Sequence, residues 1–400
     1  MIKHAVILVG GKGSRLKELT KKTPKPLIRI GKSTFLDLIL KKLSKYYFEE
    51  IYLMAGFKGD VIKKKYHNKK ILFSTIKVIV EKKTLGTGGC LNQLKNKINS
   101  NFLVFNGDSN FDLDLQVFIK KSSFFLKKKN FFCSMALVKN TNYKSNKKLA
   151  NLSISKKNIL SFKKDNGLMN SGVYIFDKNI FKLISNKKIS LEDQILPKII
   201  LDKKTVGFNF NSYFIDIGIK KNLKLYRSKI KKDENSQKCV FFDRDGVINK
   251  LDGYVTSQKK FKILPGVENA IQYLNKKNIL VIIITNQSAV GRGMITENNL
   301  NKLHLNFCLK IKKKNSSYIN DIYYCPYIKN AKIKKYNKNS IYRKPKPGML
   351  LKAIKDWGLL KKNCVMIGDQ NTDQLAAKKS GIKFLFKNNQ TLYEQVKKIY

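Results

Sequence analysis

The sequence predicts an α/β protein with two domains, and three features of its 400 residues support this prediction. The chain is longer than a usual single domain. Short apolar runs of strand length alternate with amphipathic stretches of helix length, which is typical of sheets with parallel strands. This alternation stops over residues 226–238, where the apolar content falls, and then starts again. We therefore expect domains at 1–228 and 239–400, joined by a linker at 229–238.

The expected elements follow in order along the chain. In the first half, the predicted strands are 4–10, 50–56, 102–108, 131–138 and 172–176, with an amphipathic helix at 33–46. In the second half, the predicted strands are 239–242, 279–285, 365–369 and 383–386, with helices near 266–277, 297–313 and 372–380. In open α/β sheets, ligands bind at the carboxyl ends of the strands, so polar residues at these ends are candidates for function.

The net charge of +55 invites the interpretation that the chain binds nucleic acid. Nearly all of the positive charge is lysine, however, and nucleic-acid surfaces usually use arginine for bidentate and stacking contacts. We therefore expect no specific nucleic-acid partner. The apolar runs are too short to span a bilayer, so no membrane partner is expected. The six cysteines are scattered without a CxxC pair, which suits reduced thiols in the cytoplasm.

Several polar residues in the second half stand at the ends of separate predicted strands. They are Asp243 and Asp245 after the first strand, Thr285 and Asn286 at the end of the next, Lys344 in "YRKPKPG", Asp369 in "VMIGD", and Asp373 four residues later. A polar turn after a buried strand would explain the first two residues alone. It does not explain the whole set, so we expect these side chains to converge on one site.

This set resembles the haloacid dehalogenase superfamily of phosphatases over residues 239–400. The resemblance implies that Asp243 attacks phosphorus and forms an aspartyl-phosphate, while Asp245 protonates the leaving oxygen and then activates water. It also implies Mg2+ held by Asp243, Asp369 and the backbone carbonyl of Asp245. The residues expected to contact the phosphate or the substrate are Thr285, Asn286, Arg292, Arg343 and Lys344. The segments between the motifs are too short for a large cap domain.

The motifs "DRDGVIN", "TNQSAVGRGMITE", "YYCPY" and "RKPKPGML" are similar to the branch that removes the 7-phosphate of D-glycero-D-manno-heptose 1,7-bisphosphate. Histidinol-phosphatases are near relatives. Many members of this branch carry a zinc loop, Cys-x-His followed by Cys-x-Cys. Here Cys325 is kept, but Tyr327 stands in the histidine position, and Ser340 and Tyr342 stand in the two later cysteine positions. One thiolate cannot form a tetrahedral zinc site, so zinc is not expected.

The segment "VGGKGSRL" (9–16) follows the first predicted strand and has three possible interpretations. A dinucleotide-binding fingerprint would need glycine where Leu16 stands, and a P-loop before "GKS" (31–33) would need glycine where Pro26 stands. The third interpretation is the G-G-x-G-x-R-L loop of sugar-phosphate nucleotidyltransferases, in which backbone N–H groups approach the nucleotide phosphates. The glycines of this loop are Gly10, Gly11 and Gly13.

Further motifs agree with the third interpretation, and residues 1–228 resemble this family, in particular its D-glycero-D-manno-heptose 1-phosphate guanylyltransferases. The motif residues are Lys25 in "TPKPLIRIGKSTFLD", Gly86, Thr87 and Gly88 in "EKKTLGTGG", Asp108 in "FNGD", Asn170 in "NSGVYIF", Glu192 in "SLEDQILP" and Asp216 in "FIDIGI". The resemblance implies Mg2+ at Asp108 and Asp216. Because two anions must meet in nucleotidyl transfer, it also implies catalytic roles for Arg15 and Lys25. The family carries an acidic-lysine pair near the sugar, and this chain departs from it, because "FKKD" (162–165) lacks the expected glutamate. Lys164 is still expected to meet a phosphate.

Together the resemblances imply two Rossmann-like domains in a bifunctional enzyme, an N-terminal nucleotidyltransferase domain and a C-terminal haloacid dehalogenase-like domain. The substrates they imply are heptose 1,7-bisphosphate, heptose 1-phosphate and GTP, with Mg2+ in both domains and GDP-heptose as the product. One alternative is another sugar 1-phosphate, such as mannose or glucose, with another small ester such as histidinol phosphate. A nucleic-acid end-processing protein is a rival class, against which the absence of a P-loop and of clustered arginine counts.

Overall fold

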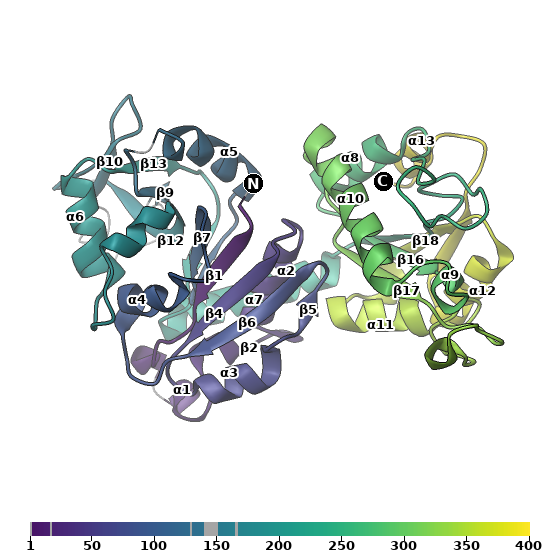
Figure 1. The fold of residues 1–400 in the computed structure, drawn as a ribbon, viewed down its shortest axis with the longest axis horizontal. Coiled ribbons are helices and arrows are strands. Elements are labelled where there is room, and N and C mark those ends of the chain that lie inside the picture. The colour runs from purple at the N-terminus through teal and green to yellow at the C-terminus, as the bar shows by residue number, and fades with distance from the viewer. Residues whose placement is uncertain (1, 17, 129, 140–150, 165–166) are drawn as a thin grey trace. The chain divides into compact units, whose positions relative to one another are not determined.

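The computed structural model describes every residue except 1, 17, 129, 140–150 and 165–166, and helices and strands alternate along most of it (Figure 1). The chain divides into two compact units. The first contains Met1–Ser44 and Phe48–Ser228, and the second contains Lys45–Tyr47 and Lys229–Tyr400. Each unit is built around its own sheet.

The first unit has a mixed sheet. Its parallel part has the order β7 (Phe102–Asn106), β1 (His4–Leu8), β4 (Glu50–Ala55) and β6 (Ser74–Val80). The expectation of parallel strands is right for this part and wrong for β12 (Leu168–Phe176), which is antiparallel to both β7 and β9 (Cys133–Lys139). A parallel neighbour needs a long crossover, usually a helix. No helix is described between β9 and β12, where the short strands β10 (Leu152–Ile154) and β11 (Leu160–Phe162) form a hairpin.

The other elements of the first unit are helices and short strands. The short strands are β2 (Arg29–Ile30), β3 (Ser33–Thr34), β5 (Lys70–Ile71), β8 (Ser109–Phe111), β13 (Thr205–Asn209) and β14 (Phe214–Asp216). Four of these strands form two separate two-stranded sheets, β2 with β3 and β8 with β14. The helices are α1 (Glu18–Lys22), α2 (Phe35–Ser44), α3 (Gly59–Tyr66), α4 (Gly86–Gly89), α5 (Leu115–Leu126) and α6 (Leu196–Leu201). Helix α2 buries Phe35, Leu36, Ile39, Leu40 and Leu43, the spacing of one apolar helix face.

Helix α7 (Lys220–Ser236) occupies most of the segment that the sequence predicts to be a linker. The segment contains neither glycine nor proline, and its lysine and glutamate residues favour the helix. Lys229 also donates to Asp233 one turn later, a spacing that stabilises helices. The low apolar content therefore marks a largely exposed helix and not a loss of regular structure.

The second unit has a parallel sheet, as expected. The strand order is β17 (Asp321–Cys325), β16 (Leu280–Asn286), β15 (Cys239–Phe242), β18 (Cys364–Gly368) and β19 (Lys383–Phe386). The helices are α8 (Val267–Lys276), α9 (Ser288–Gly291), α10 (Glu297–Asn315), α11 (Gly348–Trp357), α12 (Asn371–Ser380) and α13 (Leu392–Ile399). Strand β15 is central and fully buried, so the carboxyl ends of β16, β15 and β18 lie next to one another. Among the described residues, no helix combines the length and the apolar character that crossing a membrane requires.

Candidate active sites

The carboxyl end of β15 carries Asp243 and Asp245. The backbone N–H of Asp243 still donates to the carbonyl of Ile367 on β18 at 3.0 Å, so this residue is held by the sheet. Its side chain is buried, whereas Asp245 lies on the following loop and is partly exposed. The two carboxylates therefore differ in their surroundings although they are two residues apart.

Neighbouring side chains fix the carboxylate of Asp245. Arg244 donates from Nη2 to both oxygens at 2.8 Å and from Nε to Oδ1 at 3.2 Å. Asn249 donates to Oδ1 at 2.9 Å, and Gln287 donates to Oδ2 at 2.8 Å. Charge-assisted bidentate contacts of this kind are strong and directional. The orientation of Asp245 is therefore set by its neighbours.

Lys344 connects Asp243 to the first turn of α12. Its Nζ lies 2.8 Å from Oδ1 of Asp243 and 2.6 Å from Oδ1 of Asp373, and it donates to the carbonyl of Ile284 at 3.1 Å. The side chain of Asn286 exchanges hydrogen bonds of 3.1 Å with the backbone of Lys344, which ties this loop to β16. Burial raises the pKa of Asp243 to about 7, against the opposing effect of Lys344.

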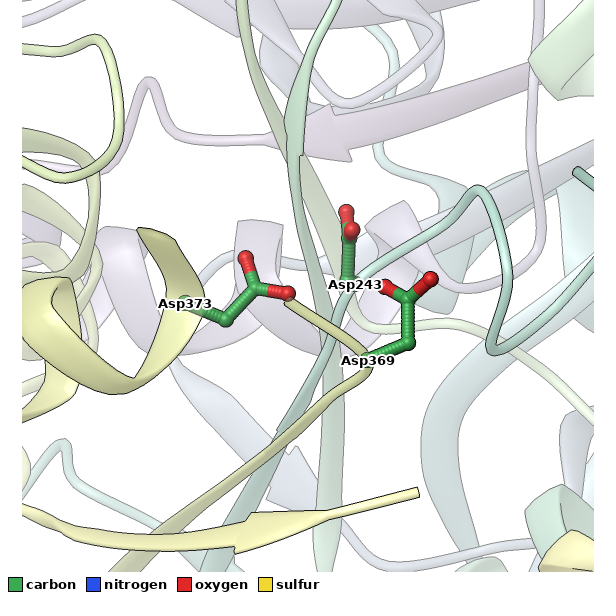
Figure 2. A group of neighbouring side chains, drawn as sticks. All are labelled: Asp243, Asp369 and Asp373. Carbon is green, nitrogen blue, oxygen red and sulfur yellow. The ribbon is translucent and has the colours of Figure 1, made fainter. Parts of the chain in front are cut away.

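Figure 2 shows the side chains of Asp243, Asp369 and Asp373 lying close together at the ends of β15 and β18 and the start of α12. Ligand oxygens of these residues lie within 4.8 Å of one another. Oδ1 of Asp369 is buried and has no hydrogen-bond partner among the described residues. A group of carboxylates with an unpaired buried oxygen fits a hard cation such as Mg2+. The sequence placed Asp373 among the converging residues without a chemical role, and it lies in this cluster beside the two predicted carboxylate ligands.

Asp243 and Asp245 line a pocket of about 180 Å³. The other predicted residues that line it are Thr285, Asn286, Arg343 and Lys344. Arg292 lies outside this lining in the described structure, with its guanidinium carbon 5.7 Å from the centre of the Tyr254 ring. Tyr254 does line the pocket. The structure thus brings together the residues predicted to contact the phosphate, except Arg292.

In the first unit, Lys25, Asp108 and Asp216 meet beside the ends of β7 and β14. The Lys25 residue is only 5% exposed. Its Nζ lies 2.6 Å from Oδ2 of Asp108 and 3.6 Å from Oδ1 of Asp216. Arg15 is more exposed, and its Nη2 lies 3.9 Å from Asp216. The N–H of Ile217 donates to the carbonyl of Asp108 at 3.0 Å, which holds the two acidic segments together.

Electrostatics also link these two carboxylates. Burial, followed by the charge of Asp108, raises the pKa of Asp216, while Lys25 opposes this rise. Like charges this close favour binding of a cation, so the donor set fits Mg2+ as the sequence predicts.

The glycines of the loop after β1 have different surroundings. Gly13 has a φ of +65°, and a Cβ at this position would lie 2.8 Å from the side chain of Thr20, so only glycine suits it. A Cβ at Gly10 would lie 3.1 Å from Glu81. At Gly11, a Cβ would meet no described atom within 4 Å, so the backbone here is open to an approaching anion.

Gly86, Thr87 and Gly88, predicted to contact the nucleotide, are packed against the segment that carries Glu192. A Cβ at Gly86 would lie 2.5 Å from the carbonyl oxygen of Ile189, and this oxygen accepts a hydrogen bond from the N–H of Gly88 at 2.9 Å. Thr87 donates its hydroxyl hydrogen to Glu192 at 2.6 Å. These contacts give the glycines a packing reason for lacking a side chain.

Asn170 lies at a bulge in β12. It donates to the hydroxyl of Tyr174 at 2.7 Å and accepts from the N–H of Gly172 at 2.9 Å. The bulge places Gly172 against the side chain of Asn106, at the end of β7. Lys164 is exposed, and residue 165 of the "FKKD" segment lies outside the described residues.

The loop that begins at Cys325 does not fit a zinc site. Cys325 is buried, and burial raises the pKa of its thiol, which disfavours the thiolate that zinc requires. Nζ of Lys338 lies 4.0 Å from the centre of the Tyr327 ring, and the hydroxyl of Ser340 accepts from the N–H of Tyr342 at 3.1 Å. Tyr327, Ser340 and Tyr342, which stand where the zinc-binding members of this branch have ligands, therefore take part in a ring contact and a hydrogen bond.

Known proteins match both halves of the chain. The nucleotidyl transferase family model matches residues 4–232, and the haloacid dehalogenase-like hydrolase model matches residues 200–381. The chain is 35% identical over 220 residues to a D-glycero-alpha-D-manno-heptose 1-phosphate guanylyltransferase of Campylobacter jejuni, covering 54% of this chain and 95% of the relative. It is 39% identical over 144 residues to a D-glycero-beta-D-manno-heptose-1,7-bisphosphate 7-phosphatase of Rhodopseudomonas palustris, covering 36% of this chain and 79% of the relative. A crystal structure of HddC from Yersinia pseudotuberculosis is 29% identical with a TM-score of 0.49, covering 57% of this chain and 100% of that chain.

The two folds and their acidic sites define an enzyme that combines nucleotidyl transfer with phosphate-ester hydrolysis. The chain belongs to the nucleotidyl transferase family through its first half and to the haloacid dehalogenase-like hydrolase family through its second half.

Sequence reasoning assigned no role to several residues around Asp245. Gln287 had a signal, because it directly follows Thr285 and Asn286 in one motif. Arg244 stands between two motif aspartates, and the sequence alone does not show where its side chain lies. His304 had no signal, because it lies sixty positions further along in an ordinary helical pattern and meets Arg244 only in the fold.

Gly246→Ala should remove most of the phosphatase activity. Gly246 has a φ of +87°, and a Cβ there would lie 2.0 Å from Oδ2 of Asp369, so this carboxylate must leave its place in the acidic cluster. A misplacement of this size can cost about a hundredfold in rate. Phosphate release from p-nitrophenyl phosphate measures the loss.

The matched control for this prediction is Gly381→Ala, after α12. Gly381 has a φ of +70°, but a Cβ there would make only ordinary contact with the side chain of Lys361 at 3.5 Å. This variant should lose about 1–2 kcal/mol of folding free energy and keep its phosphatase activity. Equal losses of activity in both variants would show that backbone strain, and not displacement of Asp369, is responsible.

Purified protein should contain no stoichiometric zinc, because the Cys325 loop offers too few zinc ligands. Phosphate release should survive a zinc-selective chelator and still require added Mg2+. Elemental analysis and chelator titration test both points, and tightly bound stoichiometric zinc would contradict the assignment of this loop.

Proposed function

We propose that the chain converts heptose 1,7-bisphosphate to GDP-heptose in two Mg2+-dependent steps, one in each unit. The observation that carries this proposal is the pairing of the relatives. One half resembles enzymes named for removing the 7-phosphate of the bisphosphate, and the other resembles enzymes named for guanylyl transfer to the 1-phosphate. Removal of the 7-phosphate leaves a heptose 1-phosphate, so the two named reactions are consecutive.

In the second unit, Asp243 attacks the 7-phosphorus and the bond from phosphorus to the sugar oxygen breaks. Asp245 gives its proton to the departing oxygen. It then takes a proton from the water that attacks the aspartyl-phosphate, which releases phosphate, frees the Asp243 carboxylate and returns Asp245 to its protonated form. Lys344, 2.8 Å from Asp243, and Thr285 in the same pocket lie where charge develops on the phosphoryl oxygens.

Asp243, Asp369 and the backbone carbonyl of Asp245 are the proposed ligands of Mg2+ in this unit. The ion would supply charge neutralisation at the phosphoryl group. The buried Oδ1 of Asp369, which has no hydrogen-bond partner in the part of the chain that the structure describes, supports this assignment.

In the first unit, an oxygen of the sugar 1-phosphate attacks the α-phosphorus of GTP, and pyrophosphate leaves with the electrons of the broken bond. Lys25 and Arg15 reduce the repulsion between these anions, and the open backbone at Gly11 suits a phosphate. Asp108 and Asp216 are the proposed Mg2+ ligands, since burial and their mutual repulsion favour a bound cation.

The two relatives differ in the anomer that their names specify, beta for the phosphatase and alpha for the guanylyltransferase. A chain that uses its own intermediate needs one anomer in both units. We assign the alpha anomer, which the name of the guanylyltransferase relative specifies. Nucleotidyl transfer does not change the configuration at the sugar carbon that carries the 1-phosphate, so the intermediate must already be this anomer.

Asp243→Asn should lower phosphate release by about a thousandfold or more, because the nucleophile is lost, and leave nucleotidyl transfer near normal. Asp108→Ala should lower nucleotidyl transfer by at least about a hundredfold and leave phosphate release near normal. Malachite-green detection of phosphate and coupled detection of pyrophosphate separate the two activities. If each soluble, folded variant loses both activities, the division into two sites is wrong.

With the alpha bisphosphate, GTP and Mg2+, the chain should release phosphate and pyrophosphate and accumulate GDP-heptose, with heptose 1-phosphate appearing transiently. Mannose and glucose 1-phosphates in place of heptose 1-phosphate should be poorer substrates. Product analysis by mass spectrometry tests this, and efficient conversion of the beta bisphosphate or of another sugar would overturn the assignment.

The intermediate should also pass between chains. An equal mixture of the Asp243→Asn and Asp108→Ala proteins should regain the overall reaction, because a tether raises local concentration without building a channel. If the mixture stays inactive while each protein keeps its own half-reaction, the intermediate does not pass through solution.

A further inference from the structure

We propose that His304 is a positioning residue for the phosphatase reaction, holding Arg244 so that Arg244 fixes the acid–base carboxylate of Asp245. The inference rests on the proposed phosphatase function and names a residue that its mechanism does not use. His304 lies on α10, and its Nε2 is 3.1 Å from Nη1 of Arg244.

Arg244 is a buried link between α10 and the loop after β15. It is 1% exposed, so each of its N–H groups needs a partner within the protein. Nε and Nη2 donate to Asp245, while Nη1 faces His304, which is also 1% exposed. The guanidinium carbon lies 5.7 Å from the centre of the Phe261 ring. Hydrogen bonds to Asp245 and His304 therefore fix the guanidinium of Arg244, which also lies near the Phe261 ring.

The chemistry of the contact defines the state of His304. A guanidinium has donors and no acceptor, so Nε2 of His304 must accept and the ring proton must sit on Nδ1. Burial, followed by the charge of Arg244, lowers the pKa of His304 well below its usual value. The neutral imidazole is thus the form that can hold Arg244, and it is the form that the surroundings favour.

Loss of this acceptor would act on Asp245 through Arg244. A buried N–H group without a partner is unfavourable, and the guanidinium could regain one by turning away from Asp245. Asn249 and Gln287 would still hold the carboxylate in the pocket. The expected result is a correctly folded site in which the proton donor has a wider range of orientations.

The leaving group can report this misorientation. A sugar alkoxide needs a proton from Asp245 as it departs, whereas a nitrophenolate leaves without one. The kcat/KM of a phosphatase that forms an aspartyl-phosphate covers the steps up to departure of the leaving group. A disturbed proton donor should therefore lower kcat/KM for the sugar ester much more than for the aryl ester.

The test compares His304→Leu with His304→Gln in the full-length chain. The amide oxygen of glutamine can take the place of Nε2 as the acceptor, whereas leucine fills a similar volume and accepts nothing. His304→Leu should lower kcat/KM for heptose 1,7-bisphosphate about tenfold, as expected for a lost hydrogen bond to a charged group. It should lower kcat/KM for p-nitrophenyl phosphate by less than about twofold. His304→Gln should stay close to the wild type on both esters.

The outcomes separate this inference from the proposed function. Equal losses on both esters, no loss on either, or failure of glutamine to restore the sugar ester would overturn the role of His304. If the wild type hydrolyses histidinol phosphate and not the heptose ester, the proposed substrate fails, and the same comparison is made on that alkyl ester. If the wild type hydrolyses none of these esters, the proposed function fails and the inference fails with it.

Discussion

In each unit, one buried lysine holds together carboxylates that would otherwise repel one another. Lys25 lies between Asp108 and Asp216, and Lys344 lies between Asp243 and Asp373. A buried charge without a partner of opposite charge is unfavourable, so the carboxylates stabilise the buried ammonium group and the ammonium group stabilises the carboxylates. The sheets bring these groups together at the ends of strands, and each lysine lies within 3.6 Å of both of its carboxylates, which offsets their repulsion.

The main features of the fold follow from local patterns, and the exceptions have physical reasons. A buried parallel strand such as β15 is recognisable because all its residues are apolar. The antiparallel direction of β12 is set by the segment that connects it to β9, and the residues of β12 themselves do not indicate it. The segment 226–238 looked like a linker because apolar residues are few, but an exposed helix needs few of them.

The candidate sites were predictable where one motif contributes several residues, as with Asp243 and Asp245. They were less predictable where the fold joins distant segments. His304 reaches Arg244 only because α10 packs beside the loop after β15, and no local pattern in α10 indicates this. For Gly86 and Gly88, the motif suggests contact with a nucleotide. The structure shows that a side chain at either position would lie unusually close to Ile189, so packing within the protein also explains why glycine stands there.

Because the chain is rich in lysine, a cluster of carboxylates is stronger evidence of a functional site than a single lysine is. With 82 lysine and arginine residues against 27 aspartate and glutamate residues, a place where several carboxylates meet is informative. A single lysine is not, because exposed lysines are abundant in this sequence. What distinguishes Lys25 and Lys344 from the others is burial against carboxylates, which the sequence does not display. Lys164 is exposed and lacks this distinction, so its proposed contact with a phosphate rests on its motif alone.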